Sequence, residues 1–157
     1  MEKKFDVIEG NPIRNGGRYI ERDSYGSGWG TLWTDGISTC LAVTLFDTKR
    51  QMGAMARIGG KKFEEVPKRL YPKNIVDTLL TEFSLSGSEE CPELEATLVG
   101  ESERTEGISD IVRESLLGLK IQIIGEDLGK VPIGREVYLH CNEKKVQVYR
   151  YTPSYNK

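Results

Sequence analysis

Three cysteines and a single histidine carry the most reactive side chains of this sequence. Cys40, Cys91 and Cys141 are odd in number, widely spaced and without a Cys-x-x-Cys pair, so we expect neither a disulfide framework nor a zinc site. Reduced thiols, the usual state in a cytoplasm, are the default expectation. His140 is the only imidazole, which excludes a histidine-rich metal site and any reaction that needs two histidines. We expect no metal and no cofactor.

Each of these residues also has an ordinary structural interpretation. Cys40 stands at the head of an apolar stretch, where a buried cysteine is commonly inert. Cys141 ends a predicted strand and is expected to pack, whereas Cys91 precedes a proline in a polar loop and is expected to be exposed. Strand alternation places His140 on the opposite face from Leu139 and Cys141. For His140, a pairing or solvent-facing role is therefore favoured over that of a base for Cys40.

The elements that must position these residues follow from hydrophobic periodicity and turn signals. Two helices are predicted, one from near Pro72 to Phe83 and one over residues 105–117, with an apolar face made of positions 108, 111, 112, 116 and 117. Loops or turns are predicted over residues 24–30, 59–70 and 125–134. Strands are predicted over residues 5–9, 17–21, 31–34, 41–46, 51–58, 94–99, 119–124, 136–141 and 146–151. This order predicts an α/β fold, a layered mixed β-sheet sandwich with flanking helices.

Three details of this scheme bear on possible sites. The runs 41–46 and 51–58 are expected to form a hairpin that is buried on both faces. Trp29 and Trp33 flank Gly30 and belong either to the core or to the roof of a ligand site. Four basic residues are mixed with glutamates and are expected to form a solvated face: Lys61, Lys62, Lys68 and Arg69.

Length and composition limit the class of protein. The 157 residues, of which 38% are hydrophobic and 29% charged, suit one globular domain. A net charge of −2 lacks the electrostatic footprint of a nucleic-acid binder. The longest mainly apolar stretch, residues 37–46, is shorter than the roughly 20 residues that span a bilayer, so no membrane insertion is expected. Residues 1–4 lead into no apolar segment, so we expect no secretory signal and a cytoplasmic location.

Several segments together resemble the chemoreceptor glutamine deamidase family (CheD). Residues 37–47 read Ile-Ser-Thr-Cys-Leu-Ala-Val-Thr-Leu-Phe-Asp, and residues 52–56 read Met-Gly-Ala-Met-Ala. The family typically reads Leu-Gly-Ser-Cys-Val-Ala-Val, a strand, an Asp-containing turn and then Gly-Gly-Met or Gly-Ala-Met. Residues 94–96, 126–129 and 146–148 fit later parts of the family pattern. The resemblance covers roughly residues 30–151 and implies a single CheD-like domain over residues 1–157, with the fold of these cysteine hydrolases.

The resemblance also implies a chemistry. In this family a cysteine attacks the side-chain amide of a protein glutamine, a histidine shuttles the proton, ammonia leaves, and water resolves the thioester. By position, Cys40 matches the nucleophile and Thr34 the threonine that supports the histidine. Arg57 stands at the position of the histidine itself. The partners implied are methyl-accepting chemoreceptors, as substrate, and a phosphatase of the chemotaxis pathway.

The departures from the family fall on the expected active face. Arg57 stays protonated and cannot accept the thiol proton. The reaction then lacks general acid–base catalysis, which increases a rate by a factor of about 10²–10⁴. It is expected either to line the old catalytic pocket, where it could stabilise a thiolate or bind a carboxylate, or to be a surface cation at a strand end. Ser38 replaces a glycine, residues 100–102 interrupt a two-glycine site, and the family's Ile-Gly-x-Arg-Asn stretch is missing. Two hypotheses stay open: a cysteine hydrolase of impaired or altered activity, and a non-catalytic protein-binding module on the same scaffold.

Overall fold

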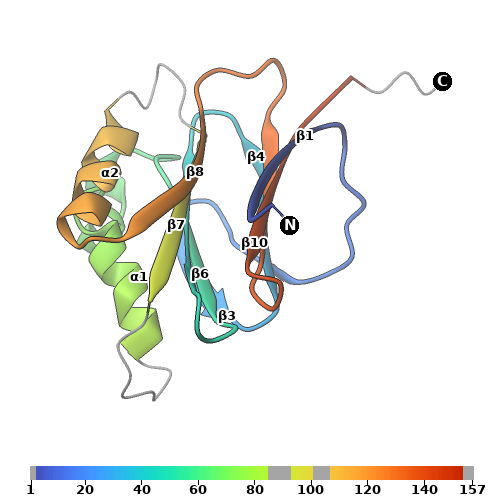
Figure 1. The fold of residues 1–157 in the computed structure, drawn as a ribbon. Helices are drawn as coiled ribbons and strands as arrows, with labels where there is room; N and C mark the ends of the chain where they lie inside the picture. The colour runs from blue at the N-terminus through green and yellow to red at the C-terminus, as the bar shows by residue number, and fades with distance from the viewer. Residues whose placement is uncertain (1–2, 85–92, 101–106, 154–157) are drawn as a thin grey trace.

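The protein has three layers, as Figure 1 shows: the two helices form one layer, and each of the two β-sheets forms another. The computed structural model describes residues 3–84, 93–100 and 107–153. Both helices cover the outer face of one five-stranded sheet, and the other five-stranded sheet packs on its opposite face. The predicted α/β class and the layered sandwich of mixed sheets are confirmed. No helix among the described residues is long and apolar enough to cross a membrane.

The sheet beside the helices, called here the inner sheet, has the order β3-β6-β5-β7-β8. Its strands are Ser24–Gly28 (β3), Leu41–Asp47 (β5), Gly53–Ile58 (β6), Leu94–Gly100 (β7) and Gln122–Leu128 (β8). Only β7 and β8 pair in parallel, and helix α2 makes the crossover between them. The helices are Ile75–Ser84 (α1) and Ile108–Gly118 (α2), and short 3-10 turns cover Phe63–Glu65 and Lys68–Leu70.

The other sheet, called the outer sheet, has the order β1-β10-β9-β4-β2. Its strands are Phe5–Glu9 (β1), Arg18–Tyr19 (β2), Thr31–Ile37 (β4), Arg135–His140 (β9) and Lys145–Arg150 (β10). The hairpin of β9 and β10 confirms the predicted final hairpin. The first and last segments of the chain thus meet in this sheet, where β1 lies parallel to β10.

The hairpin of β5 and β6 forms the centre of the molecule, as its apolar runs predicted. Every residue of both strands is buried. One face of the hairpin packs on the helices, with Leu41, Ala54 and Ala56 in that core, and the other face packs on the outer sheet, with Ala42 and Met55. A strand pair that is buried on both faces fixes the position of its ends, and the candidate site lies at one of these ends.

The apolar face predicted for the second helix is too wide. Ile108, Val112 and Leu116 are buried against the inner sheet, but Ile111 is 43% exposed and Leu117 is 59% exposed. The helix thus contacts the sheet through a narrower stripe than the sequence pattern indicated. The predicted helix residues 105 and 106 lie outside the described residues.

Two segments predicted as loops or turns form strands instead. Residues 24–28 pair antiparallel with β6 as an edge strand, because main-chain hydrogen bonds do not require the β-branched residues that mark most strands. Residues 125–128 continue β8 beside β7. Gly125, read as a turn signal, marks a close approach instead, since a Cβ there would lie 2.2 Å from the ring of Phe5.

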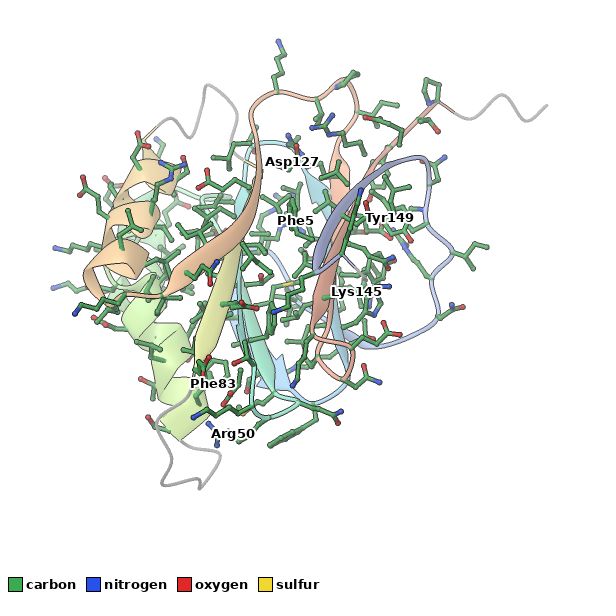
Figure 2. All side chains as sticks on the ribbon, viewed as in Figure 1. Phe5, Arg50, Phe83, Asp127, Lys145 and Tyr149 are labelled. Atoms are coloured by element: carbon green, nitrogen blue, oxygen red, sulfur yellow. The ribbon has the colours of Figure 1, made fainter. Side chains whose placement is uncertain are left out.

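A buried ion pair joins the two sheets. Asp127 on β8 accepts a 2.8 Å hydrogen bond from Arg135 Nε on β9 and also pairs with Arg150 on β10. Asp127 is 5% exposed and Arg135 is 1% exposed; Figure 2 shows Asp127 on the side of β8 that faces the outer sheet. Burial opposes ionisation of Asp127, but the hydrogen bonds from Arg150 and Arg135 outweigh it and hold the pKa of Asp127 below its usual value.

Candidate functional site

A polar pocket of about 610 Å³ lies where the inner and outer sheets meet at one end of β5 and β6. Its wall comes from four parts of the chain: Arg22, Gly36 near the end of β4 with residues 38–40 before β5, Arg57 with residues 59–62 after it, and Ile108 at the start of α2. Cys40 and Arg57 both line it. The structure therefore brings the expected nucleophile and the residue at the expected histidine position into one pocket.

The register of the central hairpin explains this proximity. Arg57 pairs with Ala42, and side chains alternate along a strand, so Arg57, Ala42 and Cys40 belong to the face of the inner sheet that looks toward the outer sheet. Arg57 is only 4% exposed, which sets aside the alternative of a surface cation. Cys40 is 3% exposed.

Thr34 contacts Arg57 across the space between the sheets. Arg57 Nη1 donates to Thr34 Oγ1 at 3.1 Å, and this hydroxyl donates to the carbonyl oxygen of Ile20 at 2.8 Å. The hydroxyl proton is committed to Ile20, so Thr34 acts as an acceptor toward the residue at position 57. Thr34 is fully buried. The register between β4 and β9 shifts just after Thr34, and Gly36 takes a φ of +62° there.

The guanidinium of Arg57 has more donors than good acceptors. Its contacts with the Gly36 carbonyl and the Tyr19 hydroxyl are long, both 3.5 Å, and Asp35 is 3.9 Å from Nη1. Asp35 is already engaged by Arg14 at 3.0 Å and by the Tyr19 hydroxyl at 2.7 Å. Arg57 Nε is buried and finds no hydrogen-bond partner in the described part of the chain. The charge of Arg57 is therefore only partly compensated.

The backbone around Cys40 depends on a glycine of the neighbouring strand. Gly100 has a φ of +120°, and a Cβ there would lie 2.2 Å from the Cys40 carbonyl oxygen. Only glycine fits this position without displacing Cys40. Ser38 lines the pocket and does not occupy the left-handed region, so serine fits this position without backbone strain. Residues 101 and 102, and Cys91, lie outside the described residues.

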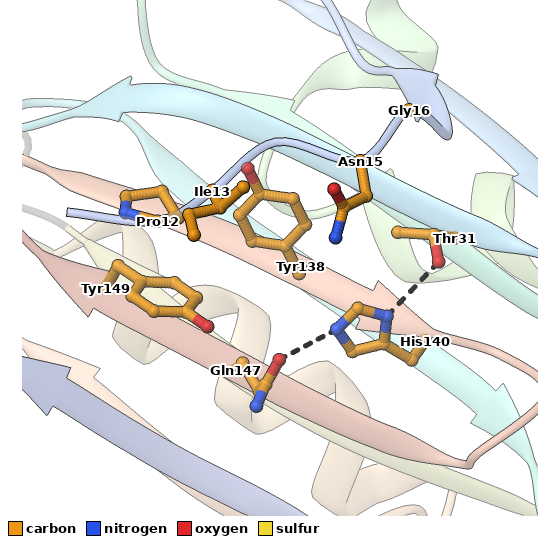
Figure 3. Close-up of a pocket in the computed structure, with 9 residues that line it drawn as sticks. All are labelled: Pro12, Ile13, Asn15, Gly16, Thr31, Tyr138, His140, Gln147 and Tyr149. Carbon is orange, nitrogen blue, oxygen red and sulfur yellow. Dashed lines mark hydrogen bonds between the residues drawn. The ribbon is translucent and has the colours of Figure 1, made fainter.

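His140 lies in a different place, on the outer face of the outer sheet. Its Nδ1 is 3.1 Å from Thr31 Oγ1 and its Nε2 is 2.9 Å from Gln147 Oε1, as the dashed lines in Figure 3 mark. It lines a small second pocket of about 130 Å³ together with Tyr138 and Tyr149. The expected pairing role is confirmed, and His140 does not line the Cys40 pocket.

The third reactive residue and the two tryptophans, Cys141, Trp29 and Trp33, lie outside the Cys40 pocket. Cys141 is buried as predicted, and burial raises the pKa of its thiol to about 11, so it is protonated at neutral pH. Trp29 is 55% exposed and does not belong to the core. Trp33 is half-buried in an aromatic row on the outer sheet, with ring centroids 4.8 Å from Tyr19 and 5.7 Å from Tyr138. Neither tryptophan lines the Cys40 pocket.

Sequence reasoning missed two features of this region. Lys61 and Lys62, expected as part of a solvated face, are exposed but line the Cys40 pocket. Their position directly after the strand that carries Arg57 was the available signal. Glu136 is fully buried next to Arg14 at 2.7 Å and Tyr151 at 2.7 Å, and no pattern in the sequence marked it. Burial opposes its ionisation, but the hydrogen bond from Arg14 and those from two tyrosines hold the pKa of Glu136 below its usual value.

The chemistry of the pocket is that of one thiol beside cations. No imidazole lines it, and Arg57 cannot serve as a base, so a proton taken from Cys40 has no acceptor side chain among the described lining residues. Within the described ranges, no three histidine, cysteine or carboxylate side chains come together as metal ligands. Searches of protein-family models and of curated proteins found no match to this sequence.

Proposed function

We propose that this protein is a divergent relative of the CheD family whose Cys40 pocket receives the glutamine side chain of a protein partner and hydrolyses it slowly. One observation supports this most strongly: the residue at the family's histidine position is held by the residue at the family's threonine position, in the pocket that Cys40 lines. Arg57 and Thr34 make that contact at 3.1 Å. This contact supports a site that keeps the family's scaffold and has its proton carrier replaced.

The proposed reaction has two steps. The Cys40 sulfur forms a bond to the carboxamide carbon and the carbon–nitrogen bond breaks, so that ammonia leaves with the thiol proton and a thioester remains. Water then attacks the thioester, which restores the thiol and leaves a glutamate side chain. Each step needs a group that moves a proton, and Arg57 supplies none. Loss of this help lowers the rate by a factor of about 10²–10⁴.

The proposed partners follow from the resemblance. A chemoreceptor with accessible glutamines is the proposed substrate, and a phosphatase of the chemotaxis pathway is the proposed regulator. Both interactions would place the protein in the cytoplasm. Gln and Glu side chains differ by one charge, and a pocket that holds Arg57 also suits the carboxylate product.

A second candidate function is favoured by the same cation. A buried guanidinium without an imidazole nearby is a binding group rather than a proton carrier, so the protein could act as a non-catalytic module that holds a partner through this pocket. Under this alternative Cys40 has a packing role, consistent with its place in the core cluster between the sheets.

Ammonia release and glutamine-to-glutamate conversion distinguish the two functions. The native protein is incubated with glutamine-containing chemoreceptor fragments, and the mass increase of about 1 Da that marks each converted glutamine is followed by mass spectrometry. Slow turnover that disappears in Cys40→Ala supports the hydrolase. Turnover that is absent from the native protein, and absent also from a folded Arg57→His variant, supports the binding module and refutes the hydrolase.

A further inference from the structure

We propose that the Cys40 pocket is a binding site for a small dianion of the phosphate type. The inference rests on the charge and the unsatisfied donors of the pocket and not on any hydrolytic activity. Four cationic side chains line it: Arg22, Arg57, Lys61 and Lys62. No aspartate or glutamate is among its described lining residues. Such a concentration of one sign of charge in a concave site attracts anions and raises their local concentration.

The buried member of this set provides the specific recognition. Arg57 is 4% exposed, its Nε has no partner among the described residues, and three of its polar contacts measure 3.5 Å or more. A guanidinium has five donors in a planar fork that fits the oxygens of phosphate in pairs. Only the 3.1 Å bond to Thr34 uses this capacity well. An anion in the pocket would accept hydrogen bonds from the Arg57 donors that have no good acceptor among the described residues.

The nearest carboxylates among the described residues do not neutralise the site. Asp35 is shared among Arg57, Arg14 and the Tyr19 hydroxyl, and its shortest contacts are with the latter two. Asp23 does not line the pocket; its Oδ1 accepts from the backbone N–H of Gly60 at 3.1 Å, and its buried Oδ2 has no hydrogen-bond partner among the described residues. Arg22, Lys61 and Lys62 form no ion pair with any carboxylate of the described residues. Among the described residues, more than one positive charge at this pocket therefore remains for a ligand, which favours a dianion over a monocarboxylate.

The shape and neighbours of the pocket agree with this ligand class. A volume of about 610 Å³ exceeds a bare phosphate and leaves space for a small organic group that carries it. Ile108, the first residue of the eleven-residue helix α2, contributes to the wall, so the partial positive charge of that helix N-terminus adds to the field of the four side chains. Ser38 and Thr39 line the same wall, and a hydroxyl group is able to donate to a phosphate oxygen.

Calorimetric titration with inorganic phosphate tests the proposal. We expect saturable binding to the native protein at low ionic strength, with acetate binding at least about tenfold more weakly because it carries one charge. Lys61→Gln/Lys62→Gln removes two exposed charges of the pocket and is expected to weaken phosphate binding at least about tenfold. The matched control is Lys68→Gln/Lys130→Gln, which removes the same charge from exposed positions outside the pocket and is expected to bind as the native protein does.

A variant of the buried arginine makes the result decisive. Arg57→Gln is expected to lose phosphate binding, and the surface variants keep the test valid if this buried substitution fails to fold. Equal phosphate affinity of the native protein and Lys61→Gln/Lys62→Gln, or no binding to the native protein, would overturn the proposal. Because no amide substrate is present, failure here leaves the deamidase proposal standing, and loss of deamidase activity leaves the anion site standing.

Discussion

Replacing Arg57 by histidine tests whether the pocket lacks only its proton carrier. Thr34 Oγ1 accepts from Arg57 Nη1 at 3.1 Å and donates its own hydrogen bond to the carbonyl oxygen of Ile20 at 2.8 Å. A histidine at position 57 would donate one ring N–H to the same acceptor, Thr34 Oγ1. Its other nitrogen would then be the unprotonated one, which is the tautomer that a base for Cys40 requires.

The expected effect on rate exceeds the expected cost in stability. A correctly placed base increases turnover by a factor of about 10²–10⁴. Arg57 makes one good hydrogen bond and two long ones, and the imidazole replaces the good one, so the loss of folding free energy is about 1–2 kcal/mol. The imidazole must be neutral to accept a proton. The gained activity should therefore appear as the pH rises through about 6.5.

Ammonia release from glutamine-containing chemoreceptor fragments measures this effect. The matched control is Arg57→Gln, whose amide N–H also donates to Thr34 but which carries no titratable group. Near-ultraviolet circular dichroism establishes that both variants are folded. A folded Arg57→His protein that turns over no faster than Arg57→Gln, or whose turnover survives Cys40→Ala, would show that the reasoning about the pocket is wrong.

Three other perturbations test the surroundings of the site. Thr34→Val removes the hydroxyl that pairs with the guanidinium and should cost about 1–3 kcal/mol in urea unfolding, whereas Thr34→Ser should cost less. Gly100→Ala would place a Cβ 2.2 Å from the Cys40 carbonyl oxygen. It should lower the free energy of unfolding by at least about 1–3 kcal/mol more than Gly129→Ala, a position with a similar positive φ and nothing near its Cβ. Equal effects of the two substitutions would contradict the packing described. Asp127→Asn should cost about 3–5 kcal/mol at pH 7 because it leaves a buried arginine unpaired. Since the folded pKa of Asp127 lies below its unfolded value of about 3.9, native stability should decline as the pH falls below about 4, and the Asn variant should decline less steeply.

The central part of the fold was predictable because its signal is burial. The runs 41–46 and 51–58 are apolar on both faces, which suits a hairpin between a helix layer and a second sheet, and the structure places it there. The glycine-containing segments were not predictable in the same way. Gly125 serves a close approach by Phe5, a residue more than a hundred positions away, and local sequence carries no mark of such a contact.

The candidate site was predictable only in part for a related reason. The hairpin register places Cys40 and Arg57 on one face, and that register follows from the two apolar runs and the short turn between them. Thr34 reaches Arg57 from the opposite sheet, so their contact depends on how the sheets stack. Lys61 and Lys62 lie in a segment whose mixture of lysines and glutamates is typical of any solvated loop. Their membership of the pocket wall depends on where residues 36–40 fold against them.

The relative rates at which iodoacetate and iodoacetamide alkylate Cys40 test most directly that this thiol faces a cationic pocket. The two reagents are similar in size and reactive group and differ in charge. With N-acetylcysteine amide as the uncharged reference thiol, we expect the iodoacetate-to-iodoacetamide rate ratio at Cys40 to be at least about tenfold higher than that of the reference at low salt. The ratio should fall toward the reference in high salt and in Lys61→Gln/Lys62→Gln. A ratio at Cys40 equal to that of the reference thiol at low salt would show that this thiol does not face a cationic pocket.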